Sequence, residues 1–150
     1  MNERILVVNG PNLSRLGRRE PDLYGRESLE DVQRRLERRA QALNCQVTFV
    51  QSNHEGALID AIQAAEETHE GIILNPGAYG HTSIALRDCL AGSPLPAVEV
   101  HLTNIHAREP FRHRLLTAPV CLGVVAGLGP LGYELALEAL VAHVRSRHAS

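Results

Sequence analysis

Apolar and polar positions follow two different periods along this chain. Short runs of apolar, mostly β-branched residues alternate with longer stretches in which apolar side chains recur every three or four positions. The short runs predict β-strands and the longer stretches predict amphipathic helices. We expect strands at about residues 4–9, 46–51, 71–75, 97–101 and 120–126. We expect helices at about residues 28–43, 55–67, 83–90 and 132–147, and a short turn after Ala107.

The helix that begins at Ser28 has the clearest signals. Ser28 and Asp31 have the spacing of a capping box, in which each side chain accepts a hydrogen bond from the other's backbone N–H. The apolar residues after them fall on one helix face: Leu29, Val32, Leu36, Ala40 and Leu43. Strands that alternate with such helices predict right-handed βαβ units. The expected fold is therefore α/β, a flavodoxin-like doubly wound sheet of five parallel strands with helices on both faces.

Three polar blocks each follow an apolar run directly. They are Asn9–Leu13, Asn75–Ser83 and Glu99–Asn104. In an open parallel sheet the carboxyl ends of the strands meet at one edge, where ligands bind. The three blocks therefore predict one polar site rather than three.

The stretch at about residues 14–26 interrupts the alternation of strands and helices. It is polar, contains proline and glycine, and carries Arg15, Arg18, Arg19, Tyr24 and Arg26. A loop of this length in a small domain is either disordered or functional. Its arginines and its tyrosine favour an active-site lid at the carboxyl edge of the sheet.

Composition narrows the class of protein. A chain of 150 residues that is 44% hydrophobic has the size of one domain, expected over residues 1–150. The net charge of −2 and the lack of a basic block argue against a nucleic-acid partner. All 15 basic residues are arginine, so a lysine Schiff base is excluded.

Cysteines, histidines and the amino-terminal segment predict neither a metal site nor export. Cys45, Cys89 and Cys121 are widely spaced and flanked by apolar residues, which predicts buried free thiols in a reducing cytoplasm. His101, His106 and His113 lack the spacing of a metal site. His69, His143 and His148 are expected in solvent.

No apolar run has the length of a membrane span and no targeting segment is recognisable, so we expect a cytoplasmic protein without a membrane partner.

Seven blocks in order resemble those of the type II 3-dehydroquinate dehydratases, and the resemblance runs from Ile5 to about Val144. They are Asn9-Gly-Pro-Asn-Leu13, Leu16-Gly-Arg-Arg-Glu-Pro21 with Tyr24-Gly25, Gln51-Ser-Asn-His-Glu-Gly56, Asn75-Pro-Gly-Ala-Tyr79 with His81-Thr-Ser83, Glu99-Val-His101, Asn104-Ile-His-Ala-Arg-Glu109 and Gly129 to Tyr133.

The resemblance implies a lyase that carries out the trans-dehydration of 3-dehydroquinate to 3-dehydroshikimate through an enolate. It implies no metal and no organic cofactor, and a homo-oligomer, a dodecamer built from trimers. The missing lysine agrees with it, because the unrelated class of this enzyme uses a lysine Schiff base. Whether the product serves biosynthesis or comes from quinate breakdown is left open by the sequence.

The resemblance also implies catalytic roles. Tyr24 corresponds to the base, and because a free tyrosine ionises only near pH 10, a nearby guanidinium must favour the phenolate. Arg19 is our choice for that partner, ahead of Arg15 and Arg18. His101 corresponds to the general acid. Glu99 lies two residues earlier on the same side of an extended segment and can orient or charge its imidazole.

The substrate contacts implied by the resemblance come from all three polar blocks. Asn12 corresponds to the residue that orients a water at the carbonyl oxygen, and its sequence context also suggests an Asx-turn that closes the first strand. The backbone amides of Leu102 and Thr103 would hold the substrate carboxylate. The remaining contacts would come from Asn75, His81, Arg112, the lid-facing Arg108, and Asp88 of a neighbouring subunit.

Three positions differ from residues common in the family: Gly80, Pro110 and Leu115. They predict a looser backbone at Gly80 and altered contacts around Arg112.

Two other functions fit parts of the sequence. One is a catalytically inactive, flavodoxin-like binding or regulatory subunit. The other is a nucleotide-binding domain, because Gly127-x-Gly129-x-x-Gly132 has the spacing of a dinucleotide fingerprint, although it follows the last strand rather than the first.

Overall fold

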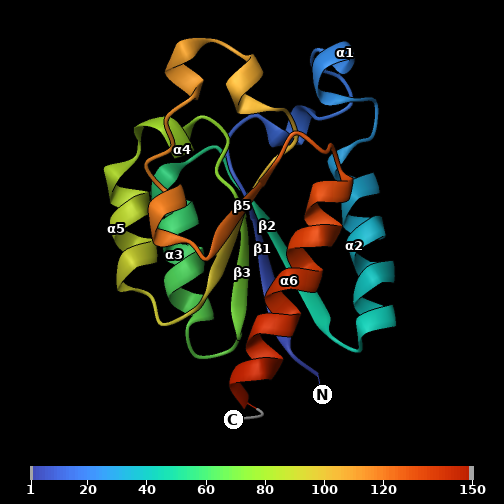
Figure 1. Cartoon of the computed structure of the whole chain (residues 1–150), viewed down its shortest axis with the longest axis vertical. Helices are drawn as coiled ribbons and strands as arrows, with labels where there is room; N and C mark the ends of the chain where they lie inside the picture. Colours follow the sequence, from blue (N-terminus) through green and yellow to red (C-terminus); the bar gives the residue numbers. More distant parts are fainter. Residues whose placement is uncertain (1, 149–150) are drawn as a thin grey trace.

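Five parallel strands form the centre of this computed structural model, which describes residues 2–148. In space the strands follow the order β2-β1-β3-β4-β5, so the chain starts near the middle of the sheet and winds outward in both directions (Figure 1). This confirms the doubly wound parallel sheet. The strands are β1 (Arg4–Asn9), β2 (Gln46–Gln51), β3 (Gly71–Asn75), β4 (Ala97–His101) and β5 (Gly123–Ala126).

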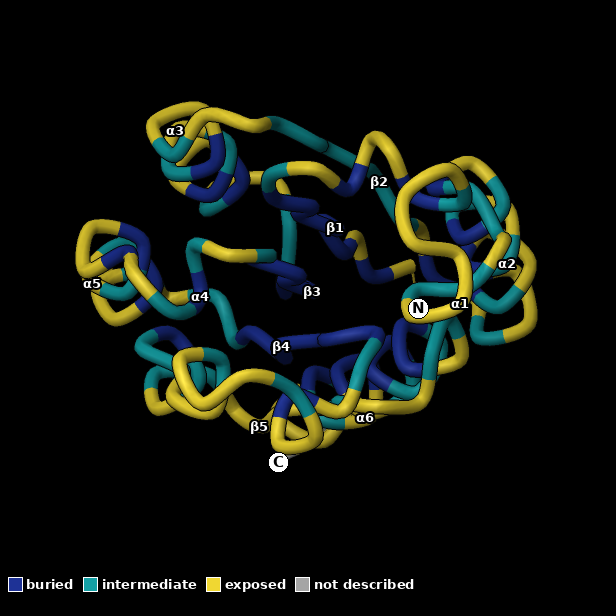
Figure 2. The backbone as a smooth tube through the Cα atoms, turned by 90° about the horizontal axis from the view of Figure 1, so that it is seen from above, coloured by how far each residue is buried: buried dark blue, intermediate teal, exposed yellow. Residues whose placement is uncertain are grey.

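Helices cover both faces of the sheet, as predicted. Figures 1 and 2 show α2 (Leu29–Leu43) and α6 (Leu131–His148) on one face and α3 (Glu55–Ala65) and α5 (Ile84–Gly92) on the other. Successive side chains of a strand point to opposite faces. Ile5 and Val7 of β1 therefore pack against α2 and α6, whereas Leu6 and Val8 pack against α3 and α5. Two apolar cores result, one on each side of a sheet whose central strands are buried.

The predicted capping box is present at the start of α2. The Ser28 hydroxyl accepts a hydrogen bond from the Asp31 backbone N–H at 3.1 Å, and the Asp31 carboxylate accepts one from the Ser28 N–H at 3.0 Å. At the other end, Asn44 adopts a left-handed conformation and its N–H bonds back to the last turn. These two signals limit α2 to the range that the sequence predicts.

Several boundaries differ from the prediction. Strand β5 begins at Gly123 instead of residue 120, because Ala118–Val120 form a 3-10 turn that contains Pro119. Pro119 has no backbone N–H to give to a sheet. α3 ends at Ala65 instead of residue 67. The turn expected after Ala107 consists of two short 3-10 turns, Ile105–Ala107 and Pro110–Arg112.

Two single-turn helices were not predicted. They are α1 (Pro21–Tyr24), inside the predicted lid, and α4 (Tyr79–Thr82), after β3. Each has four residues, which is too short to show a helical period. In Figure 1 α1 stands above the carboxyl edge of the sheet, and the segment after β4 rises beside it.

The ends of β1 and β3 approach each other very closely at this edge. The Gly10 N–H donates to the Asn75 carbonyl at 2.8 Å, and a Cβ on Gly10 would lie only 2.4 Å from the Pro76 carbonyl oxygen. Gly77 has φ +58° and turns the chain away from β3. Glycine at these two positions lets the first two polar blocks lie side by side.

The cysteines and His69 depart in part from the prediction. All three thiols are free, but only Cys45 is buried, while Cys89 and Cys121 are partly exposed. His69 is half-buried rather than in solvent, since its ring nitrogens bond to the hydroxyls of Thr48 and Thr68. Burial lowers the pKa of His69. None of the described helices combines the length and the apolar character needed to cross a membrane.

Candidate active site

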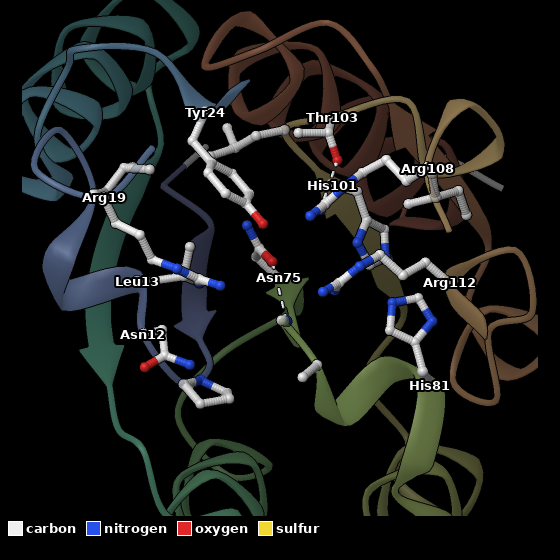
Figure 3. Close-up of a pocket in the computed structure, with 16 residues that line it drawn as sticks. Asn12, Leu13, Arg19, Tyr24, Asn75, His81, His101, Thr103, Arg108 and Arg112 are labelled. Carbon is white, nitrogen blue, oxygen red and sulfur yellow. Dashed lines mark hydrogen bonds between the residues drawn. The ribbon is translucent and has the colours of Figure 1, made fainter. Parts of the chain in front are cut away.

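A pocket of about 110 Å³ lies at the carboxyl edge of the sheet, where the three polar blocks meet. Its walls come from the ends of β1, β3 and β4, from the predicted lid and from the segment after β4 (Figure 3). Ten of the twelve predicted site residues line it: Asn12, Arg19, Tyr24, Asn75, His81, His101, Leu102, Thr103, Arg108 and Arg112. The expectation of one convergent site is confirmed geometrically.

The two remaining predicted residues lie outside the pocket lining. Glu99 is fully buried directly beneath His101. Asp88 lies on the exposed side of α5, away from the pocket. The role of Asp88 in the site of a neighbouring subunit stays a prediction.

Strand β4 holds the imidazole of His101 against the carboxylate of Glu99. The Nε2–H of His101 donates to Glu99 Oε2 at 2.6 Å, and the His101 side chain is only 7% exposed. A carboxylate only accepts hydrogen bonds, so this contact assigns the proton to Nε2 and leaves Nδ1 as the other ring nitrogen. The spacing of two residues along the strand places both side chains on the same face, as predicted.

The amide of Asn75 forms the floor of the pocket and has a fixed orientation. Its Nδ2 donates to the Tyr133 hydroxyl at 2.8 Å, and its Oδ1 accepts from the Gly77 N–H at 3.2 Å. The Tyr133 hydroxyl in turn donates to Asn9 Oδ1 at 2.7 Å. Complete burial raises the pKa of Tyr133, so its hydroxyl remains protonated and can donate. The Nδ2 group of Asn9 is buried without a hydrogen-bond partner.

Sequence reasoning missed Tyr133 as part of this floor. Tyr133 lies in the first turn of α6, 58 residues from Asn75 and 124 from Asn9. It belongs to the Gly129–Tyr133 block that contributes to the family resemblance, but nothing in that block indicates hydrogen bonds over such distances.

The lid places Tyr24 between two guanidinium groups. The Cζ atoms of Arg19 and Arg108 lie 5.3 Å and 5.1 Å from the centre of the Tyr24 ring. Helix α1 presents the tyrosine, with a left-handed residue before it (Glu20, φ 42°) and Gly25 (φ 91°) after it. Figure 3 shows the Tyr24 hydroxyl and the Arg19 guanidinium pointing into the pocket. Neither of the alternative partners considered above, Arg15 and Arg18, lines the pocket.

The opposite wall carries His81, Arg108 and Arg112. The Nδ1–H of His81 donates to the Arg114 carbonyl at 2.9 Å, which fixes the ring, and its centroid lies 6.2 Å from that of His101. Arg108 donates to the Thr103 hydroxyl at 3.4 Å, and the Nε of Arg112 donates to Glu109 at 3.1 Å.

Asn12 lines the pocket without making the expected Asx-turn. It has φ 67° and precedes the 3-10 turn Leu13–Arg15, but its side chain makes no capping hydrogen bond there. Instead its backbone N–H donates to Asn53 Oδ1 at 3.0 Å. The Asx-turn interpretation is therefore wrong, because the Asn53 side chain supports the turn.

The backbone at Gly80 is tightly packed, contrary to the prediction. A Cβ there would lie 2.8 Å from Pro76 Cγ and 3.5 Å from Leu115, and the Gly80 carbonyl accepts from the Leu116 N–H at 2.7 Å. Leu115 thus packs where a side chain at position 80 would extend. Pro110 occupies the first turn of Pro110–Arg112, where proline is compatible with a helical turn.

The glycine-rich segment after β5 supports the end of β4. The Gly127 N–H donates to the His101 carbonyl at 3.1 Å and the Gly129 N–H donates to the Leu102 carbonyl at 3.0 Å. Gly132 packs against Val125 and Val100. Since two amides of the fingerprint already bond to the chain, this segment positions His101 and does not favour the nucleotide-binding hypothesis. Among residues 2–148 no three His, Cys, Asp or Glu side chains gather in a way that could hold a metal ion.

Comparisons with known proteins show the family of this chain. A family model described as "Dehydroquinase class II" matches residues 3–141. The "3-dehydroquinate dehydratase" of Chelativorans sp. (strain BNC1) is 59% identical over 145 residues, which are 96% of this chain and all of that protein. The protein of the same name from Bacillus licheniformis is 56% identical over 134 residues, which are 89% of this chain and 92% of that protein.

A solved structure agrees as well. The crystal structure of type II dehydroquinase from Butyrivibrio crossotus is 45% identical, superimposes with a TM-score of 0.91, and is matched over 93% of this chain and 97% of that one. The comparisons of sequence and of fold thus agree, and the chain belongs to the class II dehydroquinase family.

Proposed function

We propose that this chain dehydrates 3-dehydroquinate to 3-dehydroshikimate through an enolate, with Tyr24 as the base and His101 as the general acid. Family membership supports the overall reaction, 3-dehydroquinate dehydration. The observation that carries the mechanism is that Tyr24 and His101 face one pocket from different elements, each beside a charged partner. The guanidiniums of Arg19 and Arg108 lie next to the Tyr24 ring on the lid, and at the end of β4 Glu99 holds His101.

The first step removes a proton from the carbon next to the ketone. Tyr24 as a phenolate takes this proton, and the electrons of the C–H bond form the enolate. The guanidiniums of Arg19 and Arg108 favour the phenolate because they lie about 5 Å from its ring. Asn12 would orient a water toward the developing oxyanion. This water is a neutral hydrogen-bond donor placed where negative charge develops.

The second step expels the hydroxyl group as water. The enolate electrons form the new C=C bond, the C–O bond breaks, and the imidazolium of His101 gives the leaving oxygen a proton. Nε2 is engaged by Glu99, so Nδ1 is the nitrogen that delivers the proton. The buried Glu99 carboxylate stabilises the imidazolium before transfer. Because Tyr24 is on the lid and His101 is at the end of β4, proton and hydroxyl can leave from opposite faces of the ring, as a trans-dehydration requires.

The remaining residues would bind the substrate. The backbone amides of Leu102 and Thr103 would hold its carboxylate. The fixed amide of Asn75 and the side chains of His81 and Arg112 would hold its hydroxyl groups. All of them line the pocket.

We also propose that the chain assembles as a homo-oligomer built from trimers, a dodecamer, in which Asp88 reaches a neighbouring pocket. The face of α5 that carries Asp88 supports this, because Ile84, one turn earlier, is 65% exposed. A neighbouring subunit that covers Ile84 would place Asp88 at a subunit boundary. Light scattering coupled to gel filtration tests the assembly.

The reaction is tested by following the absorbance of the conjugated enone while the purified protein acts on 3-dehydroquinate. A metal chelator is present in one sample, and a second sample is treated with borohydride before the assay. We expect the absorbance to rise at the same rate in both. No rise from folded protein would contradict the proposed reaction, and a loss with chelator or borohydride would contradict the proposed route.

A further inference from the structure

Thr117 is a fully buried residue that does not line the pocket. Only one side chain, that of Glu99, lies between it and His101. The Thr117 side chain has no solvent exposure, and its hydroxyl donates to Oε1 of Glu99, 18 residues earlier in the chain. The other carboxylate oxygen, Oε2, accepts from His101. Thr117, Glu99 and His101 therefore form a continuous series of hydrogen bonds from the core to the pocket.

The position of Thr117 in the chain makes this contact informative. Thr117 directly precedes the 3-10 turn Ala118–Val120, where a threonine hydroxyl commonly caps the turn. Here it makes no capping hydrogen bond. The backbone is held locally instead, since the Thr117 carbonyl accepts from the Val120 N–H at 3.2 Å and from the Cys121 thiol at 3.4 Å. The hydroxyl is thus directed at Glu99 by a backbone that is fixed independently.

The charges around the pocket explain why this carboxylate needs support. Among residues 2–148 three arginines line the pocket, namely Arg19, Arg108 and Arg112, and no carboxylate does. Positive charge on His101 is therefore opposed from the lid and from the segment after β4. Tyr24 and His81 are the other titratable side chains facing it. Glu99 lies beneath as the counter-charge in contact with the imidazole.

Removing a carboxylate from water is costly, so its oxygens require hydrogen-bond partners in the core. Glu99 meets this requirement through Thr117 and His101. The Cys121 thiol close by is no competing anion, because burial and the charge of Glu99 raise its pKa to about 12.

We propose that Thr117 is a positioning residue for the dehydration, acting through Glu99 on the general acid His101. Its hydroxyl holds the carboxylate in the orientation that presents Oε2 to Nε2. Without the hydroxyl, Glu99 stabilises the imidazolium less well. This inference rests on the proposed roles of Glu99 and His101.

The test uses two pairs of side chains that differ in the hydroxyl: Thr against Thr117→Val, and Thr117→Ser against Thr117→Ala. The full-length protein is assayed with 3-dehydroquinate, and kcat and KM are measured from acid to alkaline pH. We expect Thr117→Val and Thr117→Ala to lower kcat about tenfold with KM within about twofold. The alkaline limb of their kcat profile should move to lower pH, because the protonated imidazole is less stable. Thr117→Ser should keep the wild-type profile.

A control variant and a double-mutant cycle separate this role from an effect on stability. Thr48→Val removes a half-buried hydroxyl from β2, far from β4 in the sheet, and should leave the profile unchanged. In the Glu99→Gln background, Thr117→Val should lower kcat by less than a further factor of about two, because the Glu99 carboxylate through which Thr117 acts is already lost.

The outcomes are distinguishable. A wild-type profile for both Thr117→Val and Thr117→Ala, a defect in Thr117→Ser equal to that in Thr117→Ala, or full additivity with Glu99→Gln would each overturn the role of Thr117. If one hydroxyl-free variant does not fold, the other pair decides. Wild-type turnover by both Glu99→Gln and His101→Ala would instead contradict the proposed function on which the inference depends.

Discussion

The floor and the lid of the pocket are held in place by opposite means. The floor at Asn75 continues into the adjoining pair of His101 and Glu99 at the end of β4. These three side chains are at most 7% exposed, and each bonds to a buried partner or to backbone. On the lid the Arg19 side chain is 43% exposed, and its ion pair with Glu20 spans 3.9 Å. The Arg19 guanidinium is held at the pocket by its contact with the Tyr24 ring.

This difference separates two tasks of one site. Elements with few buried contacts open at low free-energy cost, as a segment that admits substrate must. Groups that must keep one orientation during the reaction belong on rigid strands. In this chain the proposed acid is on the buried part and the proposed base is on the more exposed part, the predicted lid. The predictions below change one part at a time.

The largest effect is expected from the floor. His101→Ala should lower kcat by roughly 10³-fold, within the range of general acid catalysis. At 7% exposure the site gives bulk water little access to replace the lost proton donor. Steady-state kinetics measure this, and substrate binding by calorimetry should remain within a few fold. Near-wild-type kcat would show that another group protonates the leaving hydroxyl.

A smaller but still large loss is expected from the lid. Tyr24→Phe removes the proposed base and should lower kcat by roughly 10²-fold. Because the lid is more exposed than the floor, water can partly take over proton removal. The unfolding temperature should not change, since the Tyr24 hydroxyl has no structural role in the described contacts. Exchange of the substrate α-proton with deuterated solvent, followed by NMR, should slow in parallel, and unchanged exchange would contradict the role of Tyr24 as the base.

The floor was predictable from sequence to the extent that its residues follow strands. Asn75 and His101 stand at the ends of apolar runs, and the spacing of Glu99 and His101 placed both on one face. The hydroxyls that hold these groups were not predictable. Thr117 and Tyr133 lie in a loop and in a helix, and their partners are 18 and 58 residues away. No local sequence pattern indicates a contact between residues so far apart in the chain.

The lid shows the reverse case. Its position and its chemistry could be predicted from composition, because arginines and a tyrosine in a long loop are unusual. Its conformation could not, since α1 is one turn bounded by two residues with positive φ, Glu20 and Gly25. The same limit applies to the start of β5, which was predicted at residue 120, although Val120 still belongs to a 3-10 turn and the strand begins at Gly123.

Arg19→Gln sharpens the contrast within the lid itself. Removing one of the two guanidiniums near Tyr24 disfavours the phenolate, so kcat at neutral pH should fall by about tenfold. The loss of positive charge should move the acid limb of the profile to higher pH, so part of the activity returns in alkaline buffer. Arg18→Gln is the matched control, because Arg18 belongs to the same loop but does not line the pocket. An equal shift in both variants would assign the effect to the charge of the loop as a whole.

The smallest effect on activity is expected from Tyr133→Phe, which loosens the floor without touching a reacting group. The change removes the hydroxyl that bonds to both Asn9 and Asn75 and should lower the free energy of unfolding by about 1–3 kcal/mol. With its amide no longer fixed, Asn75 should bind substrate more weakly, raising KM a few fold while kcat changes less. Ile62→Val, in the core on the other face of the sheet, serves as a control of similar stability loss, about 1 kcal/mol, that should leave KM unchanged. An unchanged KM in Tyr133→Phe would mean that backbone contacts alone, such as that from the Gly77 N–H, orient Asn75 and that the rigidity of the floor does not depend on α6.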